Sequence, residues 1–265
     1  MKLLRNSKSK KHRRHRALIP LRRVLRPMTL VKAQHSNVVN IRGFIGEAER
    51  EEILRVIRSC NLESYTSNDK EDINEFGEAI HTTMYLQTGN IFGAKLDWLK
   101  QKITRLVVKI NQRESWGFNL TCRNTFNVRV AEYHNMRKGG SLPDIQHYDI
   151  GSIITVDIML QEATQGGKFV TLESTAQRKS SLKKVPGLLP ALKGCHLKPH
   201  DFAVGDILVF VSHKFHCVSE VQEGTRKVLV IEFWNGQQRQ CGHRCDRRFG
   251  RCRFVDTPTY QDHVR

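Results

Sequence analysis

The sequence has no long apolar run. Hydrophobic residues make up 39% of its 265 residues, and no apolar stretch approaches the about 20 residues that a membrane span needs. A secretory signal is also missing, because the apolar segment 17–21 is short and is followed at once by Arg22 and Arg23. Seven Cys, an odd number, then indicate reduced thiols in a reducing compartment. We therefore expect no membrane span and one large domain with appendages.

Acidic residues are missing from the first 30 residues, which carry 11 Lys or Arg. The net charge of +18 lies mainly at the two ends, since residues 31–236 carry 26 basic and 23 acidic residues. We expect a basic disordered arm over 1–36 and an Arg/Cys-rich tail over 237–265. Either end could bind nucleic acid or an acidic partner, or serve as an address. The arm favours the cytoplasm or nucleus, with the mitochondrion as the alternative, because Pro20 and Pro27 interrupt a transit-peptide helix.

Helices are expected early in the chain and strands late. Apolar residues at helical spacing predict helices over 46–60 and 92–112, within a helical support region 37–125. The strand signals mark 126–236 as the core, with a basic insertion over 175–200. They lie at 126–133, 153–160, 168–172, 206–211 and 227–234. This order predicts a mostly β fold with helical support, an antiparallel sandwich or jelly roll.

A metal site is expected around His147, Tyr148 and Asp149. In an extended segment, residues i and i+2 point the same way, so His147 and Asp149 would share one side. One imidazole and one carboxylate are two thirds of a facial triad for iron. His216, on a later strand, can supply the third ligand, and His213 is a competing candidate that fits the spacing less well.

A carboxylate anchor is expected at Arg226. It follows Gly224 and begins the last strand, ten residues after His216. In an antiparallel hairpin this spacing can return Arg226 to the same face as His216. A guanidinium at that place would hold a carboxylate bidentately.

In this order the motifs resemble the iron(II)- and 2-oxoglutarate-dependent dioxygenases of the prolyl 4-hydroxylase type. The resemblance covers residues 98–234 and not the arm, the insertion or the tail. It depends on the His-Tyr-Asp triplet, on the turn 166–169 (Gly-Gly-Lys-Phe), on the Gly-Asp pair at 205–206, and on His216 with Arg226.

The resemblance implies a double-stranded β-helix and a role for each residue. His147, Asp149 and His216 would bind Fe(II). Arg226 would hold the distal carboxylate of 2-oxoglutarate with the hydroxyl of Tyr133, and Thr155 would assist. The family's reaction implies dioxygen as co-substrate, succinate and CO2 as products, and room for ascorbate as a reductant.

The expected function is therefore hydroxylation of a protein or peptide side chain, with proline the first choice. A nucleic-acid dealkylase on the same fold is the alternative that the basic ends invite. Such dealkylases carry a second Arg six residues after the oxoglutarate Arg, where this chain has Glu232. A non-catalytic nucleic-acid-binding module is the third hypothesis, against which the complete ligand set argues.

The tail offers Cys241, Cys245 and Cys252 at spacings that a zinc site can use. The paired Cys-x-x-Cys form of strong zinc motifs is missing. His243 stands between two of these Cys and would crowd a tetrahedral site. We therefore expect free thiols in a basic tail rather than zinc.

Overall fold

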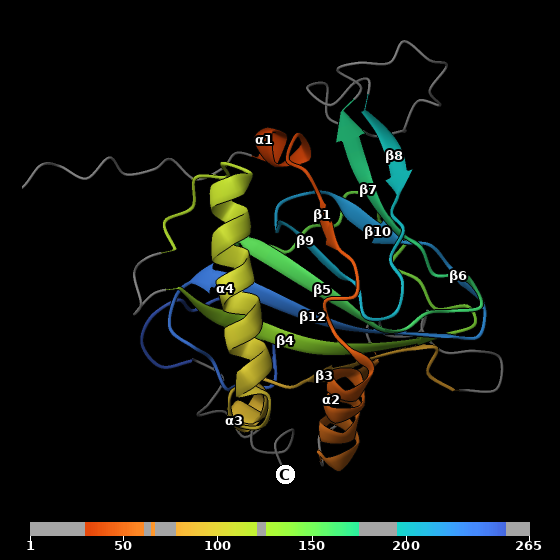
Figure 1. Cartoon of the computed structure of the whole chain (residues 1–265), viewed down its shortest axis with the longest axis horizontal. Coiled ribbons are helices and arrows are strands. Elements are labelled where there is room, and N and C mark those ends of the chain that lie inside the picture. The colour runs from red at the N-terminus through yellow and green to blue at the C-terminus, as the bar shows by residue number, and fades with distance from the viewer. Residues whose placement is uncertain (1–29, 61–64, 67–77, 121–125, 175–194, 253–265) are drawn as a thin grey trace, which may run out of the picture.

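The computed structural model of the chain describes residues 30–60, 65–66, 78–120, 126–174 and 195–252. Its centre is a seven-stranded antiparallel sheet in the order β1-β9-β5-β12-β4-β3-β2 (Figure 1). The strands are β1 (Val39–Ile41), β2 (Tyr65–Thr66), β3 (His81–Tyr85), β4 (Phe126–Arg137), β5 (Ile154–Gln161), β9 (Ile207–Val211) and β12 (Thr225–Asn235). Within these ranges, no helix has both the length and the apolar character to cross a bilayer.

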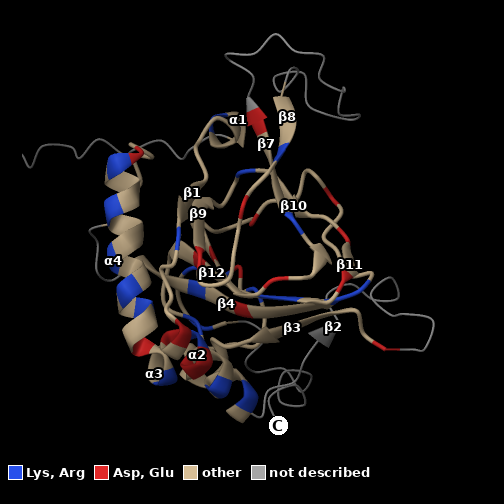
Figure 2. Ribbon diagram, turned by 45° about the vertical axis from the view of Figure 1, so that its right-hand side comes forward, with Lys and Arg blue, Asp and Glu red and all other residues tan. Residues whose placement is uncertain are grey.

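Helices cover one face of this sheet (Figure 1). The helical elements are α1 (Leu30–Gln34), α2 (Glu47–Ser59), η1 (Thr88–Asn90), α3 (Ile91–Lys95) and α4 (Asp97–Arg113). The apolar faces of α2 and α4 pack with the sheet into the largest core cluster. Both helices also carry many charged residues, coloured in Figure 2, and none of these is among their buried residues. The expected helix over 46–60 is thus present as α2. The expected helix over 92–112 is divided at Leu96, whose φ of −125° is not helical.

Strand alternation separates the two faces of the large sheet. On β5, Ile154, Val156 and Ile158 pack toward the helices. Thr155 and Asp157 point to the opposite face and line a cavity there. One strand therefore supplies both the core and the site, because its side chains alternate.

Smaller sheets close over the cavity face. One is the sheet β10-β7-β8, and the other is the pair β11-β6. Their strands are β6 (Gln165–Gly166), β7 (Phe169–Ser174), β8 (Cys195–Pro199), β10 (His216–Val218) and β11 (Val221–Glu223). Phe169 on β7 packs against Phe210 of the large sheet, with ring centroids 5.3 Å apart. The two layers enclose a second apolar cluster and complete a jelly-roll arrangement, as expected.

The structure revises the expected arm. Residues 30–34 form α1, and Gln34 is buried. Its side-chain oxygen accepts a hydrogen bond from the backbone N–H of Phe215 at 2.7 Å. Disorder over 1–36 is therefore wrong from residue 30 onward, because a polar side chain ties this end to the core. Residues 1–29 lie outside the described residues.

Other expected boundaries also shift. The support region 37–125 contains β1 and β3, which belong to the large sheet. Within the expected insertion 175–200, residues 195–199 form β8 and pair with β7, while residues 175–194 lie outside the description. The tail is not separate from the core either, since Gly89 donates a backbone hydrogen bond to Gln240 at 3.0 Å.

Candidate active site

A cavity of about 310 Å³ lies between the large sheet and the smaller ones. Inward residues of β3, β4, β5 and β12 form its floor, and Phe169 and His216 come from the opposite layer. Its lining mixes apolar side chains with charged groups.

The three expected metal ligands lie together in it. The donor atoms of His147, Asp149 and His216 all lie within 4.8 Å of one another. His147 Nε2 is 3.5 Å from Asp149 Oδ1, and His216 Nε2 is 4.0 Å from Asp149 Oδ2. Tyr148, which lies between His147 and Asp149 in the sequence, packs against Phe215, with ring centroids 5.8 Å apart. Two imidazoles and one carboxylate in this arrangement are the donor set of a facial triad.

Neighbouring groups fix the orientation of Asp149. Its backbone N–H donates to Ser212 O at 2.9 Å, and Thr155 donates its hydroxyl to Asp149 Oδ2 at 2.6 Å. Because Thr155 has only one hydroxyl proton, the hydroxyl of Ser212, 2.9 Å away, donates to Thr155 in turn. Burial alone would raise the pKa of Asp149, but His216, His147 and Arg244 together lower it. The carboxylate is thus held ionised, as a metal ligand must be.

The backbone sets the tautomer of His216. Its Nδ1 lies 2.9 Å from Lys214 O, which can only accept a hydrogen bond. Nδ1 therefore carries the proton, and Nε2 keeps its lone pair on the side of Asp149. The competing ligand His213 lies elsewhere, against Tyr148, with ring centroids 5.7 Å apart. His216 is the imidazole that the fold brings to the triad.

Arg226 reaches the same cavity, although not through the expected hairpin. His216 lies on β10, which pairs with β7, whereas β12 with Arg226 pairs with β4 and β5. The two residues meet because the two sheets face each other. Arg226 is only 3% exposed, its Nε has no hydrogen-bond partner, and its Nη1 reaches Met136 Sδ at 4.0 Å. Such a guanidinium can still receive an anion.

Asp157 is a cavity residue that the sequence analysis missed. It is buried, and its Oδ1 has no hydrogen-bond partner. Burial raises the pKa of Asp157 to about 8, although the charge of Arg226 opposes this. Its position on the strand beginning at residue 154, two residues after Thr155, was the available signal, because both belong to the same face.

The structure corrects the role expected of Tyr133. Tyr133 packs with the helix-side core, while its neighbours Glu132 and His134 line the cavity on the other face of β4. Burial raises the pKa of the Tyr133 hydroxyl to about 12, and Arg58 of α2 is the charge that it senses. Its hydroxyl therefore cannot meet a carboxylate held by Arg226. Thr155 does line the cavity, and it donates its hydroxyl to the candidate metal ligand Asp149.

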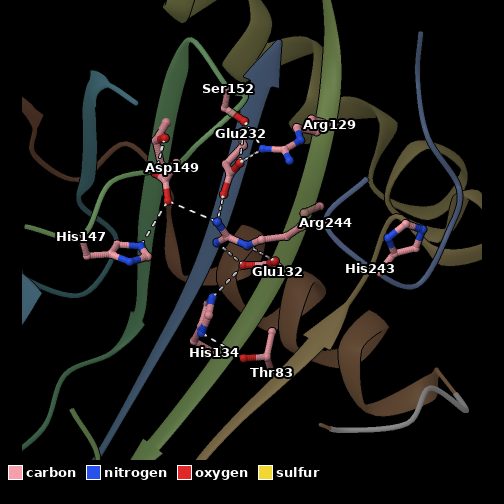
Figure 3. Close-up of polar contacts among 12 residues, drawn as sticks. Thr83, Arg129, Glu132, His134, His147, Asp149, Ser152, Glu232, His243 and Arg244 are labelled. Atoms are coloured by element: carbon pink, nitrogen blue, oxygen red, sulfur yellow. Dashed lines mark hydrogen bonds and ion pairs between the residues drawn. The ribbon is translucent and has the colours of Figure 1, made fainter. Parts of the chain in front are cut away.

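Arg244, assigned to the tail by the sequence analysis, extends into the site (Figure 3). It makes two 2.7 Å contacts to the carboxylate of Glu132, through Nε and Nη2. Its Nη1 lies 2.7 Å from Glu232 and 3.3 Å from Asp149. One guanidinium thus serves three buried carboxylates, one of which belongs to the triad.

Further polar contacts extend from this cluster in two directions (Figure 3). Glu132 contacts His134 Nε2 at 3.1 Å, and Thr83 lies 3.2 Å from the other ring nitrogen of His134. On the other side, Ser152 donates its hydroxyl to Glu232 at 2.5 Å. Arg129 also reaches Glu232, at 3.3 Å. The triad is therefore one end of a continuous polar network.

Solved structures similar to this chain share its fold at low sequence identity. An oxidoreductase of the 2OG-Fe(II) oxygenase family from Burkholderia pseudomallei is 16% identical, with a TM-score of 0.51 over 77% of this chain and 87% of that chain. A Pseudomonas putida prolyl-4-hydroxylase is 13% identical, with a TM-score of 0.50 over 78% of this chain and 99% of that chain. The non-heme alpha ketoglutarate dependent epimerase SnoN from nogalamycin biosynthesis is 13% identical, with a TM-score of 0.52 over 78% of this chain and 81% of that chain.

No protein-family model and no curated protein matches the sequence. The structural matches nevertheless confirm the expected fold: the chain has the mostly β, jelly-roll fold of 2OG-Fe(II) oxygenases, which prolyl 4-hydroxylases share. The similar structures carry different activities, so the fold alone does not select a reaction.

Proposed function

We propose that the chain is an Fe(II)- and 2-oxoglutarate-dependent oxygenase, and that it hydroxylates a protein or peptide side chain. The observation that carries this proposal is one cavity in which His147, Asp149 and His216 converge and which Arg226 also lines. A metal site alone would allow several chemistries. A buried guanidinium without a carboxylate hydrogen-bond partner adds a place for a dicarboxylate.

The donor set fits ferrous iron. Two neutral imidazole nitrogens and one carboxylate oxygen leave positions open on the metal for a chelating co-substrate and dioxygen. His216 has the required tautomer through Lys214 O, and Asp149 is held by Thr155. The triad is thus ordered by hydrogen bonds that do not depend on the metal.

Arg226 and Asp157 fit the distal carboxylate of 2-oxoglutarate. Arg226 would donate two charge-assisted hydrogen bonds to it. Asp157, with its pKa raised to about 8, would be protonated at neutral pH and could donate a third. This arrangement replaces the Tyr133 hydroxyl that the family resemblance implied.

Iron with 2-oxoglutarate and dioxygen would supply the oxidation: substrate C–H becomes C–OH, and the keto acid becomes succinate and CO2. The chain's own residues position and shield the reactants. Val228, Val230 and Phe169 give apolar walls that exclude water. The Arg244 cluster forms the charged wall beside Asp149. Binding, orientation and exclusion of water are the protein's part in such chemistry.

A prolyl side chain is the first substrate to test. The similarity to a prolyl-4-hydroxylase supports this choice, whereas the similarity to an epimerase makes stereochemical inversion the competing outcome. The two outcomes differ in the product, since hydroxylation adds one oxygen atom and epimerisation leaves the mass unchanged. Mass spectrometry of a proline-containing peptide panel separates them.

The test of the proposal is succinate release that requires both Fe(II) and 2-oxoglutarate. Protein with demonstrated iron occupancy should release succinate, and the Asp149→Ala variant should not. Asp201→Ala is the matched control, because Asp201 is exposed and lies outside the cavity. Absence of succinate from iron-loaded wild type over the peptide panel would refute the proposal, as would full activity of Asp149→Ala.

A further inference from the structure

The segment 237–252 has a defined structure although it has neither regular secondary structure nor an apolar core of ordinary side chains. It contains no helix or strand. Its only apolar residue besides cysteine is Phe249, which is 54% exposed. Such a polar, Arg-rich segment has too little apolar surface to order itself. Yet Cys241, Cys245 and Cys252 are only 3%, 0% and 4% exposed, and they cluster with one another rather than with the main core.

A fourth donor completes this group. One donor atom from each of Cys241, His243, Cys245 and Cys252 lies within 4.8 Å of all the others. His243 Nε2 is 3.2 Å from Cys252 Sγ. Tetrahedral zinc with Zn–S bonds of about 2.3 Å places its ligands about 3.8 Å apart. Small side-chain rotations are therefore enough to close the site. His243, which was expected to crowd such a site, places its donor atom within 4.8 Å of all three Sγ atoms.

The chemistry of the group favours a single soft cation. Three buried cysteine side chains with Sγ atoms within 4.8 Å of one another would repel one another as thiolates. A divalent ion removes that cost, and the resulting site keeps one net negative charge. Arg239, Arg247 and Arg251 lie in the same segment and carry the opposite charge. Among the described cysteines there is no disulfide that would order the segment instead.

We propose that Cys241, His243, Cys245 and Cys252 bind one zinc ion, and that this site holds Arg244 in the active-site cavity. Arg244 lies between two of the four ligands in sequence, while its guanidinium reaches Glu132, Glu232 and Asp149. Figure 3 shows Arg244 inside this cluster and His243 outside it. The first part of the proposal is independent of the oxygenase function, and the second part rests on it.

The backbone of the segment is anchored to the same strands. Gln87 donates its amide to Cys241 O at 3.2 Å and to His243 O at 3.3 Å. Its side-chain oxygen accepts from the backbone of Ala131 on β4 at 3.0 Å. Arg129, also on β4, donates to Cys245 O at 2.8 Å. The zinc site and the floor of the cavity therefore share a frame, and the ion would add a second attachment for the residues on both sides of Arg244.

Metal content of the full chain tests the first part. Purified protein should hold one equivalent of zinc by plasma mass spectrometry, and His216→Ala should lower iron but not zinc. Cys252→Ser should lose the zinc, whereas the control Cys60→Ser should keep it, because Cys60 lies at the end of α2. Cobalt replacing zinc in wild-type protein should show thiolate charge-transfer and tetrahedral bands, a readout that requires neither turnover nor a folded cysteine variant. Absence of these bands, zinc retained by Cys252→Ser, or iron with sulfide in this site would overturn the assignment.

Combining two perturbations tests the link to Arg244. Zinc loss through Cys252→Ser should weaken binding of 2-oxoglutarate to the iron-loaded protein by the same factor as Arg244→Met does. The double variant should show no further loss, because both changes remove the same contact. Independent, multiplying effects would refute the link while leaving the zinc site intact. If the chain binds no 2-oxoglutarate at all, the oxygenase function and this second part fail, and the metal analysis still decides the first.

Discussion

Replacing Arg244 by Met removes the cation that three buried carboxylates share. Glu132 and Glu232 are 1% and 0% exposed, so neither can take up water in exchange. Breaking a buried ion pair by removing one partner costs about 3–5 kcal/mol. Because 32% of the Arg244 side chain is exposed, we expect the lower end, a loss of about 3 kcal/mol in the free energy of unfolding.

The pKa of Glu132 gives a second estimate of how much its contacts with Arg244 and His134 contribute to the free energy of unfolding. Burial raises this pKa, but Arg244 and then His134 outweigh it and lower it from 4.5 to about 2. At about 1.4 kcal/mol per unit, this shift is worth roughly 3 to 4 kcal/mol, close to the value obtained from the ion pair. A depressed carboxylate pKa stabilises the fold above the unfolded value of 4.5, and that stability is lost as the pH falls toward 2. The deficit of Arg244→Met should therefore be full at pH 7 and should shrink below about pH 4.5.

Urea unfolding of wild type, Arg244→Met, Glu132→Gln and the double variant checks this reasoning. The effects of the two single changes on the free energy of unfolding should be strongly non-additive, with a coupling energy of about 1–3 kcal/mol. Arg248→Met is the control and should shift stability by less than about 0.5 kcal/mol, because the Arg248 side chain is exposed. A coupling energy near zero, or an Arg244→Met deficit that does not change with pH, would show that the contact does not stabilise the protein.

Three further predictions concern the co-substrate. Arg226→Gln should raise the KM for 2-oxoglutarate by roughly 10- to 100-fold, the value of a charge-assisted hydrogen bond, without lowering iron content; the exposed Arg105→Gln should match wild type. Wild-type affinity for 2-oxoglutarate should fall above pH 8, as Asp157 ionises beside the bound carboxylate, whereas Asp157→Asn should be independent of pH there; an identical profile contradicts this role. Other charged groups that Asp157 senses are shared by both proteins: Arg226, Asp149, Glu232 and Arg244. Tyr133→Phe should leave the KM for 2-oxoglutarate unchanged, and a several-fold increase would return Tyr133 to the site.

Local patterns predicted the frame of the cavity well. The β-branched run after residue 152 became β5, and the apolar alternation after residue 125 became β4. His147 and Asp149 lie two residues apart in the loop before β5, rather than on a strand as expected, so their proximity is a short-range property of the sequence. The prediction of His216 as the third ligand required one long-range assumption, namely that its strand lies opposite the segment with His147 and Asp149.

Predictions that depended on register were less successful. Tyr133 was assigned to the cavity by family resemblance, yet side chains on a strand alternate, and a shift of one residue exchanges the two faces. Pairing of His134 with Val228, and of Tyr133 with Leu229, fixes which of them faces inward. Local sequence does not contain that register, because both residues could be cavity or core. Asp157 was missed for the related reason that its burial depends on the whole floor of the cavity.

The role of the charge in the basic tail was the prediction that differs most from the structure, and the reason is electrostatic. Sequence patterns placed Arg226 in the site and predicted that the charge of the tail serves as an address or a partner surface. In the structure, Arg244 contacts three buried carboxylates: Glu132, Asp149 and Glu232. Among the described residues 126–174 and 195–236, Arg129 is the Lys or Arg side chain that forms an ion pair with one of them, Glu232. Such a surplus of buried negative charge is unfavourable without a further cation.

Arg244 supplies that cation from 95 residues beyond Asp149 and 112 beyond Glu132. No spacing rule predicts a contact of this kind, because it requires the segment 237–252 to be ordered first. The cysteines that would order it were visible in the sequence, and so was the acidic Glu232 on the last strand. What connects them is the balance of charge in the cavity: the strands provide more buried carboxylates than cations, so the expected core 126–236 is electrostatically incomplete. The metal-ligand spacing of the tail and the acid surplus of the core are therefore two signs of the same arrangement.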